Sequence, residues 1–183
     1  MKTEFETRFL DINKKDFIAK LETLGATDKG EVKLDEIIFY DKDLKWLEEH
    51  KFVRLRKENN IIKLTFKSNK EQTADSAREV EFTVPNFDEP KDFLEAIGLV
   101  AYRVVEKYRH TFELKNVTLG IDTWPKISTY VELEGDSVDD LKLVTSIIGF
   151  DWDKRFDGDA RFVYKKYGYD FDNLKIVTFK EFK

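Results

Sequence analysis

Three stretches of the sequence place apolar residues at the spacing of one helix face, and each ends at a glycine. They are Lys14 to Leu24 before Gly25, Pro90 to Ile97 before Gly98, and Ser137 to Ile148 before Gly149. In the third stretch, Ser137 and Asp140 have a spacing similar to that of an N-terminal capping box. A weaker helical pattern runs from Ala160 to Tyr167. The sequence therefore predicts three amphipathic helices and a fourth short one.

Most of the remaining sequence alternates apolar and polar residues with a period of two between turn residues, which predicts β-strands. The predicted strands are Glu4 to Leu10, Ile37 to Asp41, Lys51 to Lys57, Ile61 to Lys67, Arg78 to Val84, Ala101 to Phe112, Val117 to Thr123 and Thr129 to Glu134. Glu58, Asn59 and Asn60 predict a hairpin turn between two of them, because Asn tolerates left-handed backbone conformations. Neighbouring strands are therefore expected to pair antiparallel.

The chain is rich in charge but nearly balanced in sign. Charged residues make up 38% of its 183 residues, against roughly 25% in an average soluble domain, and 32 basic residues oppose 37 acidic ones. Sequence-independent binding to nucleic acid requires a basic excess, so we expect no nucleic-acid partner. The length favours a single domain over residues 1–183, and there is no cysteine to form a disulfide.

Neither an export signal nor a membrane span is expected from the sequence. Residues 1–20 carry charges throughout and have no apolar core typical of a signal peptide. No apolar run approaches the roughly 20 residues that a bilayer-spanning helix needs. We therefore expect a cytoplasmic protein with no membrane partner.

The placement of charge within the predicted strands is the most informative feature. Residues two apart share one face of a strand, and charged residues recur at this spacing opposite apolar ones. The acids in such positions are Glu4, Glu6, Glu79, Glu81, Asp122, Glu132 and Glu134. The bases are Arg8, Arg54, Arg56, Lys63, Lys67, Lys107 and Arg109. Each strand carries mostly one sign, which disfavours the plainer interpretation of an open sheet with a solvated face.

These patterns predict an α+β fold in which eight antiparallel strands close into a barrel, with helices packed on the outside and charges inside. Like-signed carboxylates in such an interior need a cation between them, and clustered Lys and Arg need a polyanion. A polyphosphate with a divalent metal answers both demands. Carboxylate oxygens without neighbouring Cys or His favour Mg²⁺ or Mn²⁺ over Zn²⁺. No Gly-rich phosphate loop is present, so side chains would hold the phosphates.

At this point the sequence resembles the CYTH superfamily of triphosphate tunnel metalloenzymes. Glu4 to Arg8 stands where this family has its Glu-x-Glu-x-Lys signature, with Arg8 in place of the lysine. The later blocks of the family match in order and approximate spacing: Val53 to Arg56, Lys63 to Lys67, Arg78 to Glu81, Val105 to Arg109, Gly120 to Asp122 and Tyr130 to Gly135. Residues after Phe150 carry little of the resemblance.

The resemblance implies an eight-stranded tunnel in which acids bind the metal and bases grip a triphosphate. By position, Glu4, Glu6, Glu132 and Glu134 would be the main metal ligands, with Glu79, Glu81 and Asp122 as further acids. Arg8, Arg54, Arg56, Lys63, Lys67, Lys107 and Arg109 would hold the substrate. Arg8, Lys107 and Asp122 are the candidate catalytic residues. Arginine at position 8 keeps the charge of lysine but holds an oxyanion as a planar fork.

Two reactions fit such a site, and the sequence leaves both open. One is hydrolysis of a triphosphate such as ATP, tripolyphosphate or thiamine triphosphate; the other is cyclisation of ATP to cyclic AMP and pyrophosphate, as in class IV adenylyl cyclases. The non-catalytic alternative is a protein that binds or senses polyphosphate or a nucleotide. A protein-interaction domain with a solvated charged sheet is disfavoured by the segregation of sign. The protein is expected to be a monomer or homodimer.

Overall fold

The computed structural model describes residues 2–69 and 77–183, and only the backbone of residues 2–4, 69 and 77. The strands are β1 (Lys2–Phe9), β2 (Thr27–Asp41), β3 (Lys51–Glu58), β4 (Ile61–Asn69), β5 (Ala77–Val84), β6 (Leu99–Leu114), β7 (Val117–Thr123), β8 (Tyr130–Gly135) and β9 (Ile176–Val177). The helices are α1 (Lys14–Thr23), α2 (Lys45–Glu48), α3 (Asp88–Ala96), α4 (Val138–Ile147) and α5 (Ala160–Lys166), with short 3-10 turns η1 (Trp152–Lys154) and η2 (Phe171–Asn173). The fold is therefore α+β, and the four predicted helices and eight predicted strands are confirmed.

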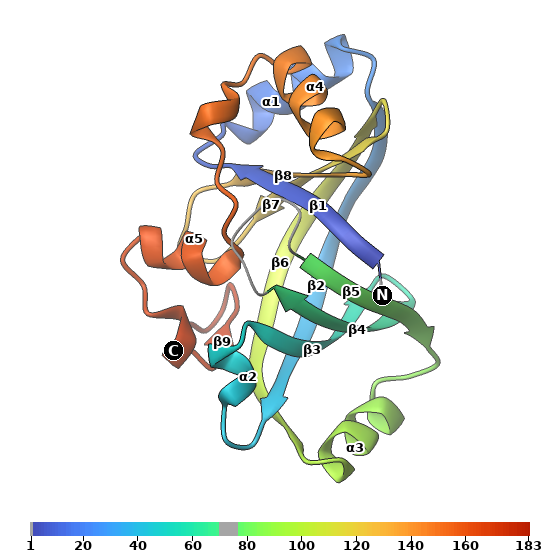
Figure 1. Ribbon diagram of the computed structural model, residues 1–183, viewed down its shortest axis with the longest axis vertical. Helices are drawn as coiled ribbons and strands as arrows, with labels where there is room; N and C mark the ends of the chain where they lie inside the picture. The colour runs from blue at the N-terminus through green and yellow to red at the C-terminus, as the bar shows by residue number, and fades with distance from the viewer. Residues whose placement is uncertain (1, 70–76) are drawn as a thin grey trace.

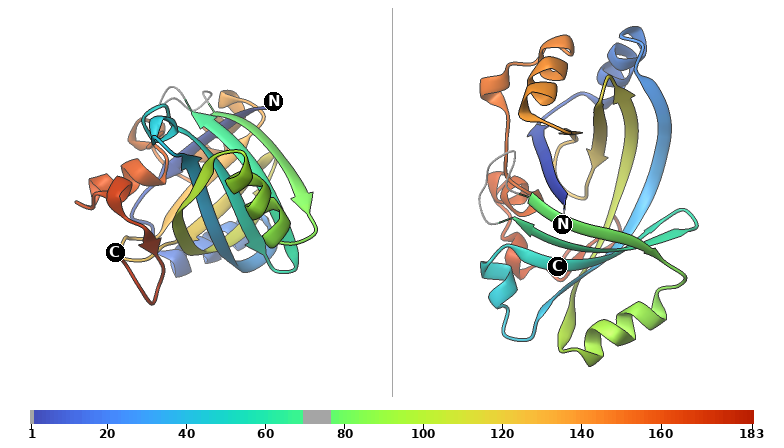
Figure 2. Two further views of the ribbon diagram at one scale, coloured as in Figure 1. Left: turned by 90° about the horizontal axis from the view of Figure 1, so that it is seen from below. Right: turned by 45° about the vertical axis from the view of Figure 1, so that its right-hand side comes forward.

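Eight antiparallel strands form a strongly curled sheet (Figure 1). Their hydrogen-bonded order is β2-β3-β4-β5-β1-β8-β7-β6, and β6 also pairs antiparallel with β2 from Leu99 to Glu113. Figure 2 shows β2 and β6 running the length of the molecule, with β3, β4 and β5 curling away toward one end and β1, β7 and β8 toward the other. This curl turns one face of every long strand toward a common interior.

Strand β1 joins two parts of the sheet. Its first residues, Lys2 to Glu4, pair with β5, whereas Phe5 to Phe9 pair with β8. Near its end, Arg8 forms a β-bridge with Phe156, a residue far away in the sequence. β1 therefore connects the sheet to the C-terminal part of the chain.

Helices α1 and α4 cover the outer face of β1, β6, β7 and β8, as the sequence predicts. Phe17 and Leu21 of α1 and Leu141 and Val144 of α4 are buried in one apolar cluster with strand residues such as Leu119. Both helices begin at a side-chain cap: the side chain of Asn13 accepts a hydrogen bond from the backbone of Asp16, and Ser137 accepts one from the backbone of Asp140, as the sequence predicts for the latter pair. Burial of these apolar faces fixes the helices on the outside of the curl.

The C-terminal part of the chain packs differently from this expectation. Val163 and Tyr164 of α5 and Phe171 of η2 share a second buried cluster with Ile38 and Val105, whose side chains face the interior of the sheet. A helix thus fills one end of the curl from within. Strand β9 adds a short parallel pairing to β6 at Val104 and Val105.

Strand β2 is much longer than the sequence predicts, because it begins at Thr27 rather than at Ile37. Its first residues, Thr27 to Gly30, have no apolar side chain, and the register shifts at Gly30. The sequence prediction omits the residues from Glu31 to Asp35, although they alternate polar and apolar side chains. Within the described part of the chain, no helix has the length and apolar character needed to cross a membrane.

Candidate functional site

A cavity of about 380 Å³ lies inside the curled sheet, within the usual size range of small-molecule sites. Most of the predicted site residues line it: Glu6, Arg8, Arg54, Arg56, Lys63, Lys67, Glu79, Glu81, Lys107, Arg109, Glu132 and Glu134. Asp122 does not reach the lining, since it is fully buried behind Lys107 and Arg109. Glu4 lies on β1, but its side chain is outside the described part of the structure.

One wall of the cavity contains closely paired charges. Asp122 accepts hydrogen bonds from Lys107 Nζ at 2.9 Å and from Arg109 Nε at 2.6 Å. Glu132 accepts hydrogen bonds from Arg109 Nη2 at 2.8 Å and from Arg8 Nη2 at 2.5 Å. Strand register explains this chain of contacts, because Arg109 lies opposite Asp122 and Arg8 lies opposite Glu132.

Neighbouring carboxylates stabilise the two arginines of this wall. Burial opposes the charge of Arg8 most strongly, but Glu132 and Glu6 outweigh it and raise its pKa. Burial is likewise outweighed at Arg109, where Asp122 and Glu132 raise the pKa. The charges of Arg8 and Arg109 are therefore already balanced by carboxylates of the protein.

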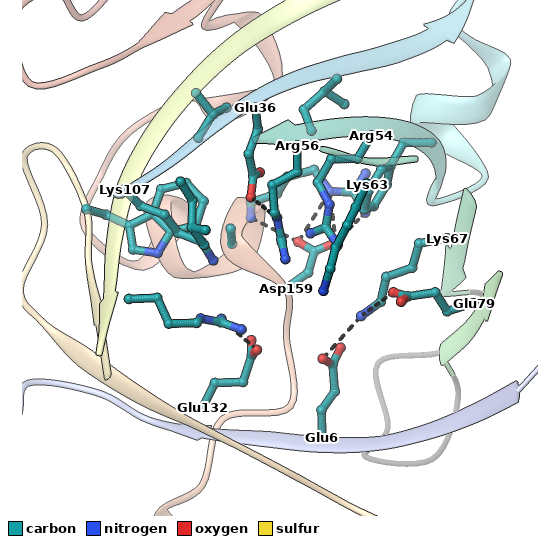
Figure 3. Close-up of a pocket in the computed structure, with 18 of the residues that line it drawn as sticks. Glu6, Glu36, Arg54, Arg56, Lys63, Lys67, Glu79, Lys107, Glu132 and Asp159 are labelled. Atoms are coloured by element: carbon teal, nitrogen blue, oxygen red, sulfur yellow. Dashed lines mark hydrogen bonds and ion pairs between the residues drawn. The ribbon is translucent and has the colours of Figure 1, made fainter. Parts of the chain in front are cut away.

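A second wall, formed by β2 and β3 and adjoining the first at Lys107 of β6, has more positive than negative charge. Arg54 and Arg56 of β3 and Lys107 of β6 surround Glu36 of β2, which accepts a hydrogen bond from Arg56 Nε at 2.7 Å. Burial raises the pKa of Glu36, but Arg56, Arg54 and Lys107 outweigh it and lower the pKa to about 2. Figure 3 shows Arg54 and Arg56 pointing into the space that Glu6 and Glu132 enter from the other side.

Arg54 and Lys107 are less well compensated than Arg8 and Arg109, since Arg54 has a longer ion pair and Lys107 shares Asp122 with Arg109. Burial, followed by the neighbouring Arg56, lowers the pKa of Arg54, whose Nη2 lies 3.8 Å from the carboxylate of Glu81. Burial, followed by Arg109, lowers the pKa of Lys107 to about 8. This wall therefore gains stability when an anion enters the cavity.

Three buried N–H groups in the lining lack a hydrogen-bond partner. They are Arg8 Nε, Arg54 Nε and Trp124 Nε1, and in the described residues they account for all but one of the side-chain atoms of this kind. A buried donor without an acceptor costs about 1–3 kcal/mol. A ligand composed of acceptor oxygens would satisfy such donors.

The carboxylates that line the cavity could bind a cation rather than an anion. Glu6 of β1 and Glu134 of β8 are directly opposite each other in register and line the same cavity. Glu79 and Glu81 line it from β5, where Glu81 contacts Lys63 at 3.1 Å. Lys67 lies 3.2 Å from Glu6. Directly opposed carboxylates repel each other and suit a hard cation.

The carboxylates are arranged as ion pairs rather than as a preformed metal cluster. No group of three or more His, Asp or Glu side chains is placed to hold a metal among the residues that the structure describes. Glu6 illustrates the reason. Burial raises its pKa most strongly, but Lys67 and Arg8 outweigh this effect and lower it, so the carboxylate is ionised and partnered by bases.

The lining residues that were not predicted from the sequence include Glu36, Glu58, Arg103, Trp124, Asp159 and Arg161. A signal existed for Arg103, which shares a strand face with Lys107 and Arg109 at two-residue spacing. Glu36 lies just before the predicted start of its strand. Asp159 and Arg161 come from the start of α5, and no local pattern in the sequence indicates that this helix faces the interior.

The folds of solved structures resemble this one at low sequence identity. A protein of Pyrococcus horikoshii is 20% identical, with a TM-score of 0.74 over 87% of this chain and 98% of that one. A candidate adenylate cyclase of Vibrio parahaemolyticus is 14% identical, with a TM-score of 0.74 over 90% and 98% of the two chains. A candidate adenylyl cyclase of Hippeastrum, described as having a dominant triphosphatase activity, is 13% identical, with a TM-score of 0.62 over 92% and 96%.

No curated protein matches the chain. The family model of the CYTH domain matches residues 2–148, which include strands β1 to β8 and almost all of the described lining of the cavity. The resemblance of the short sequence blocks is thus matched over most of the length of the protein. The chain belongs to the CYTH domain family.

Proposed function

We propose that the protein is a metal-dependent enzyme that binds a triphosphate in this cavity and cleaves or cyclises it. The observation that carries the proposal is a set of buried donors that an anion would complement. They are Arg54, the orphaned N–H of Trp124, and Lys107, which shares its close carboxylate, Asp122, with Arg109. A triphosphate has several negative charges and accepts hydrogen bonds through its oxygens, so it complements these groups. Membership of the CYTH family supports the same reaction class.

The cationic wall would act on the ligand in two ways. Arg54, Arg56 and Lys107 would hold phosphate oxygens, with Lys63 and Lys67 nearer the carboxylates of β5 and β1. The same groups would neutralise charge that develops on the departing phosphate chain, and such fixed donors are effective in a site shielded from water. Arg8 and Arg109 would contribute less, because Glu132 and Asp122 already engage them.

The donors present fit a hard divalent cation such as Mg²⁺ or Mn²⁺. Glu6 and Glu134 oppose each other across two strands and supply carboxylate oxygens, and Glu4 is on the same face of β1 by its position in the sequence. When bound, the metal would neutralise phosphate charge and activate the attacking oxygen. Lys67 would adjust to this arrangement, since it contacts Glu6 in the ligand-free protein.

Lys107 predicts a pH dependence of binding. In the free protein it loses its proton near pH 8, whereas a bound anion stabilises the ammonium form. We expect the affinity for tripolyphosphate to fall about tenfold per pH unit above 8, with proton uptake on binding. In Lys107→Met, the affinity should depend less steeply on pH, because the titrating amine is gone. Titration of tripolyphosphate itself affects both proteins equally and cancels in the comparison. Calorimetric titrations from pH 7 to 9.5 measure it, and equal slopes would contradict the role of Lys107.

The same shift has a consequence for folding. The pKa of Lys107 is lower in the folded protein than in the unfolded chain, so the unfolded state binds more protons between about pH 8 and 10. The contribution of Lys107 to the stability of the ligand-free protein therefore increases as the pH rises through this window.

Product analysis tests the proposal and separates the two reactions. ATP, tripolyphosphate and thiamine triphosphate are offered in turn with Mg²⁺ or Mn²⁺, and the products are identified. Orthophosphate indicates hydrolysis, whereas cyclic AMP with pyrophosphate indicates cyclisation. The absence of turnover on all three would contradict an enzymatic role.

A binding or sensing protein is the second candidate, and the ion pairing of Glu6 and Glu132 favours it. These carboxylates contact Lys67, Arg8 and Arg109, which compete with a metal for the same oxygens. A sensor would bind tripolyphosphate and be stabilised by it without metal-dependent turnover. The same product analysis, combined with a thermal shift measurement, therefore distinguishes the two.

A further inference from the structure

The C-terminal segment, residues 150–183, enters the cavity although it lies outside the part of the chain that matches the CYTH model. We propose that this segment closes one end of the cavity and that Asp159 acts as a stop that limits the length of the bound phosphate chain. The inference rests on the proposed function, because it requires a ligand made of linked phosphates.

Packed side chains fill the space behind the stop. Val163, Tyr164 and Val177 have no exposed surface, and Phe171 is 6% exposed. Arg103, which reaches this end from β6, donates to the backbone carbonyls of Phe171 and Leu174 at 2.7 Å each. A packed apolar core of this kind offers no path for a polyanion.

Residues on β1 fasten the segment to the wall of the cavity. The backbone N–H of Arg8 donates to Phe156 at 3.0 Å, and that of Phe156 donates back at 2.8 Å. Arg8 Nη1 donates to the carbonyl of Gly158 at 2.9 Å, and Thr7 Oγ1 donates to Asp157 at 2.6 Å. The chain is tightly packed at Gly158, because an added Cβ would lie 2.8 Å from atoms of Phe156 and Phe162.

The identity of residue 8 affects how firmly the C-terminal segment is held against β1. The fork of Arg8 reaches Gly158 with one nitrogen and Glu132 with another, in two different elements. The single ammonium of a lysine, as in the family signature, holds such a pair of acceptors less well. Arg8 is therefore a positioning residue for the segment that carries Asp159.

Asp159 brings a negative charge to the closed end of a cavity whose walls bind anions. Its carboxylate accepts hydrogen bonds from Arg161 Nη2 at 2.6 Å and Nε at 3.0 Å. Burial raises its pKa, but Arg161 outweighs burial and lowers it, so Asp159 is ionised at neutral pH. Figure 3 shows Asp159 among the side chains that line the cavity. A further phosphate placed here would meet the carboxylate of Asp159, which already occupies the donors of Arg161.

The test compares phosphate chains of different length. Tripolyphosphate and tetrapolyphosphate are titrated into wild type and Asp159→Asn by calorimetry, without divalent metal so that turnover does not interfere. Asparagine preserves the N-terminal cap that Asp159 gives α5 while removing its charge. Asp153→Asn is the matched control, because that carboxylate belongs to an exposed residue of the same segment that does not line the cavity.

We expect wild type to bind tetrapolyphosphate no more tightly than tripolyphosphate, despite its extra charge. Asp159→Asn should raise the affinity ratio of tetrapolyphosphate to tripolyphosphate about tenfold, and Asp153→Asn should leave it unchanged. Arg8→Lys, which loosens the segment, should shift the ratio in the same direction and expose residues 150–183 to limited proteolysis.

An unchanged ratio in both Asp159→Asn and Arg8→Lys would overturn the length stop while leaving the proposed function intact. A wild type that favours tetrapolyphosphate in proportion to its charge would overturn it as well. If wild type binds neither chain, the proposed function itself fails, and the stop with it.

Discussion

Replacing Arg54 with methionine is expected to weaken tripolyphosphate binding about 100-fold while leaving the ligand-free protein at least as stable as the wild type. The loss in affinity reflects two charge-assisted hydrogen bonds in a buried site. The effect on stability follows from the lowered pKa of Arg54, which shows that burial and Arg56 disfavour its charge. A methionine of similar length fills the space without that penalty. Titration calorimetry and thermal unfolding measure the two effects.

Arg109→Met is the matched contrast on the compensated wall. It would remove Arg109 from the fully buried Asp122 and leave it the ion pair with Lys107, so we expect a loss of about 3–5 kcal/mol in unfolding free energy. If Arg54→Met destabilised the protein as much as Arg109→Met, or bound tripolyphosphate as tightly as wild type, the division of the cavity into two walls would be wrong.

Glu134→Gln is expected to reduce turnover at least about 100-fold at modest metal concentration, because it removes a charge from the opposed carboxylate pair. Glu6→Gln should have the same effect on turnover. In addition, its contacts with Lys67 and Arg8 predict a modest loss of stability, about 1–3 kcal/mol. Initial rates at several Mg²⁺ and Mn²⁺ concentrations provide the measurement.

The control for these variants is Glu113→Gln, since Glu113 lies on β6 and pairs with Lys29 outside the cavity. Its rates should equal those of wild type at every metal concentration. Wild-type rates in both Glu6→Gln and Glu134→Gln at low metal concentration would reject the assignment of this pair to the metal.

Much of the architecture was predictable because local signals agree with the final packing. Helix α4 has its cap at Ser137, an apolar stripe and a terminal glycine, and all three are used in the structure. The hairpin between β3 and β4 places Asn59 in the left-handed region, as its sequence indicates. Alternating charge also predicts which strand faces meet, since the described residues of both the acidic and the basic sets gather around one cavity.

Other features depend on contacts that local sequence does not encode. Ile38 and Tyr40 are apolar on the interior face because α5 and η2 pack against them. The strand therefore does not alternate between polar and apolar residues there, and Glu36 could not be predicted as a cavity residue. The uneven compensation of charge has a similar origin. Arg54 and Arg8 look alike in the sequence, but strand register gives Arg8 the opposite Glu132 and leaves Arg54 with a distant carboxylate.

The central claim is that the cationic wall of the cavity is a binding site for a chain of phosphates. Calorimetric titration of the wild-type protein with tripolyphosphate and with orthophosphate, at neutral pH and constant ionic strength, tests it most directly. The account predicts one tripolyphosphate per chain, bound at least about 100-fold more tightly than orthophosphate. Equal affinities for the two anions, or no binding of tripolyphosphate, would contradict it.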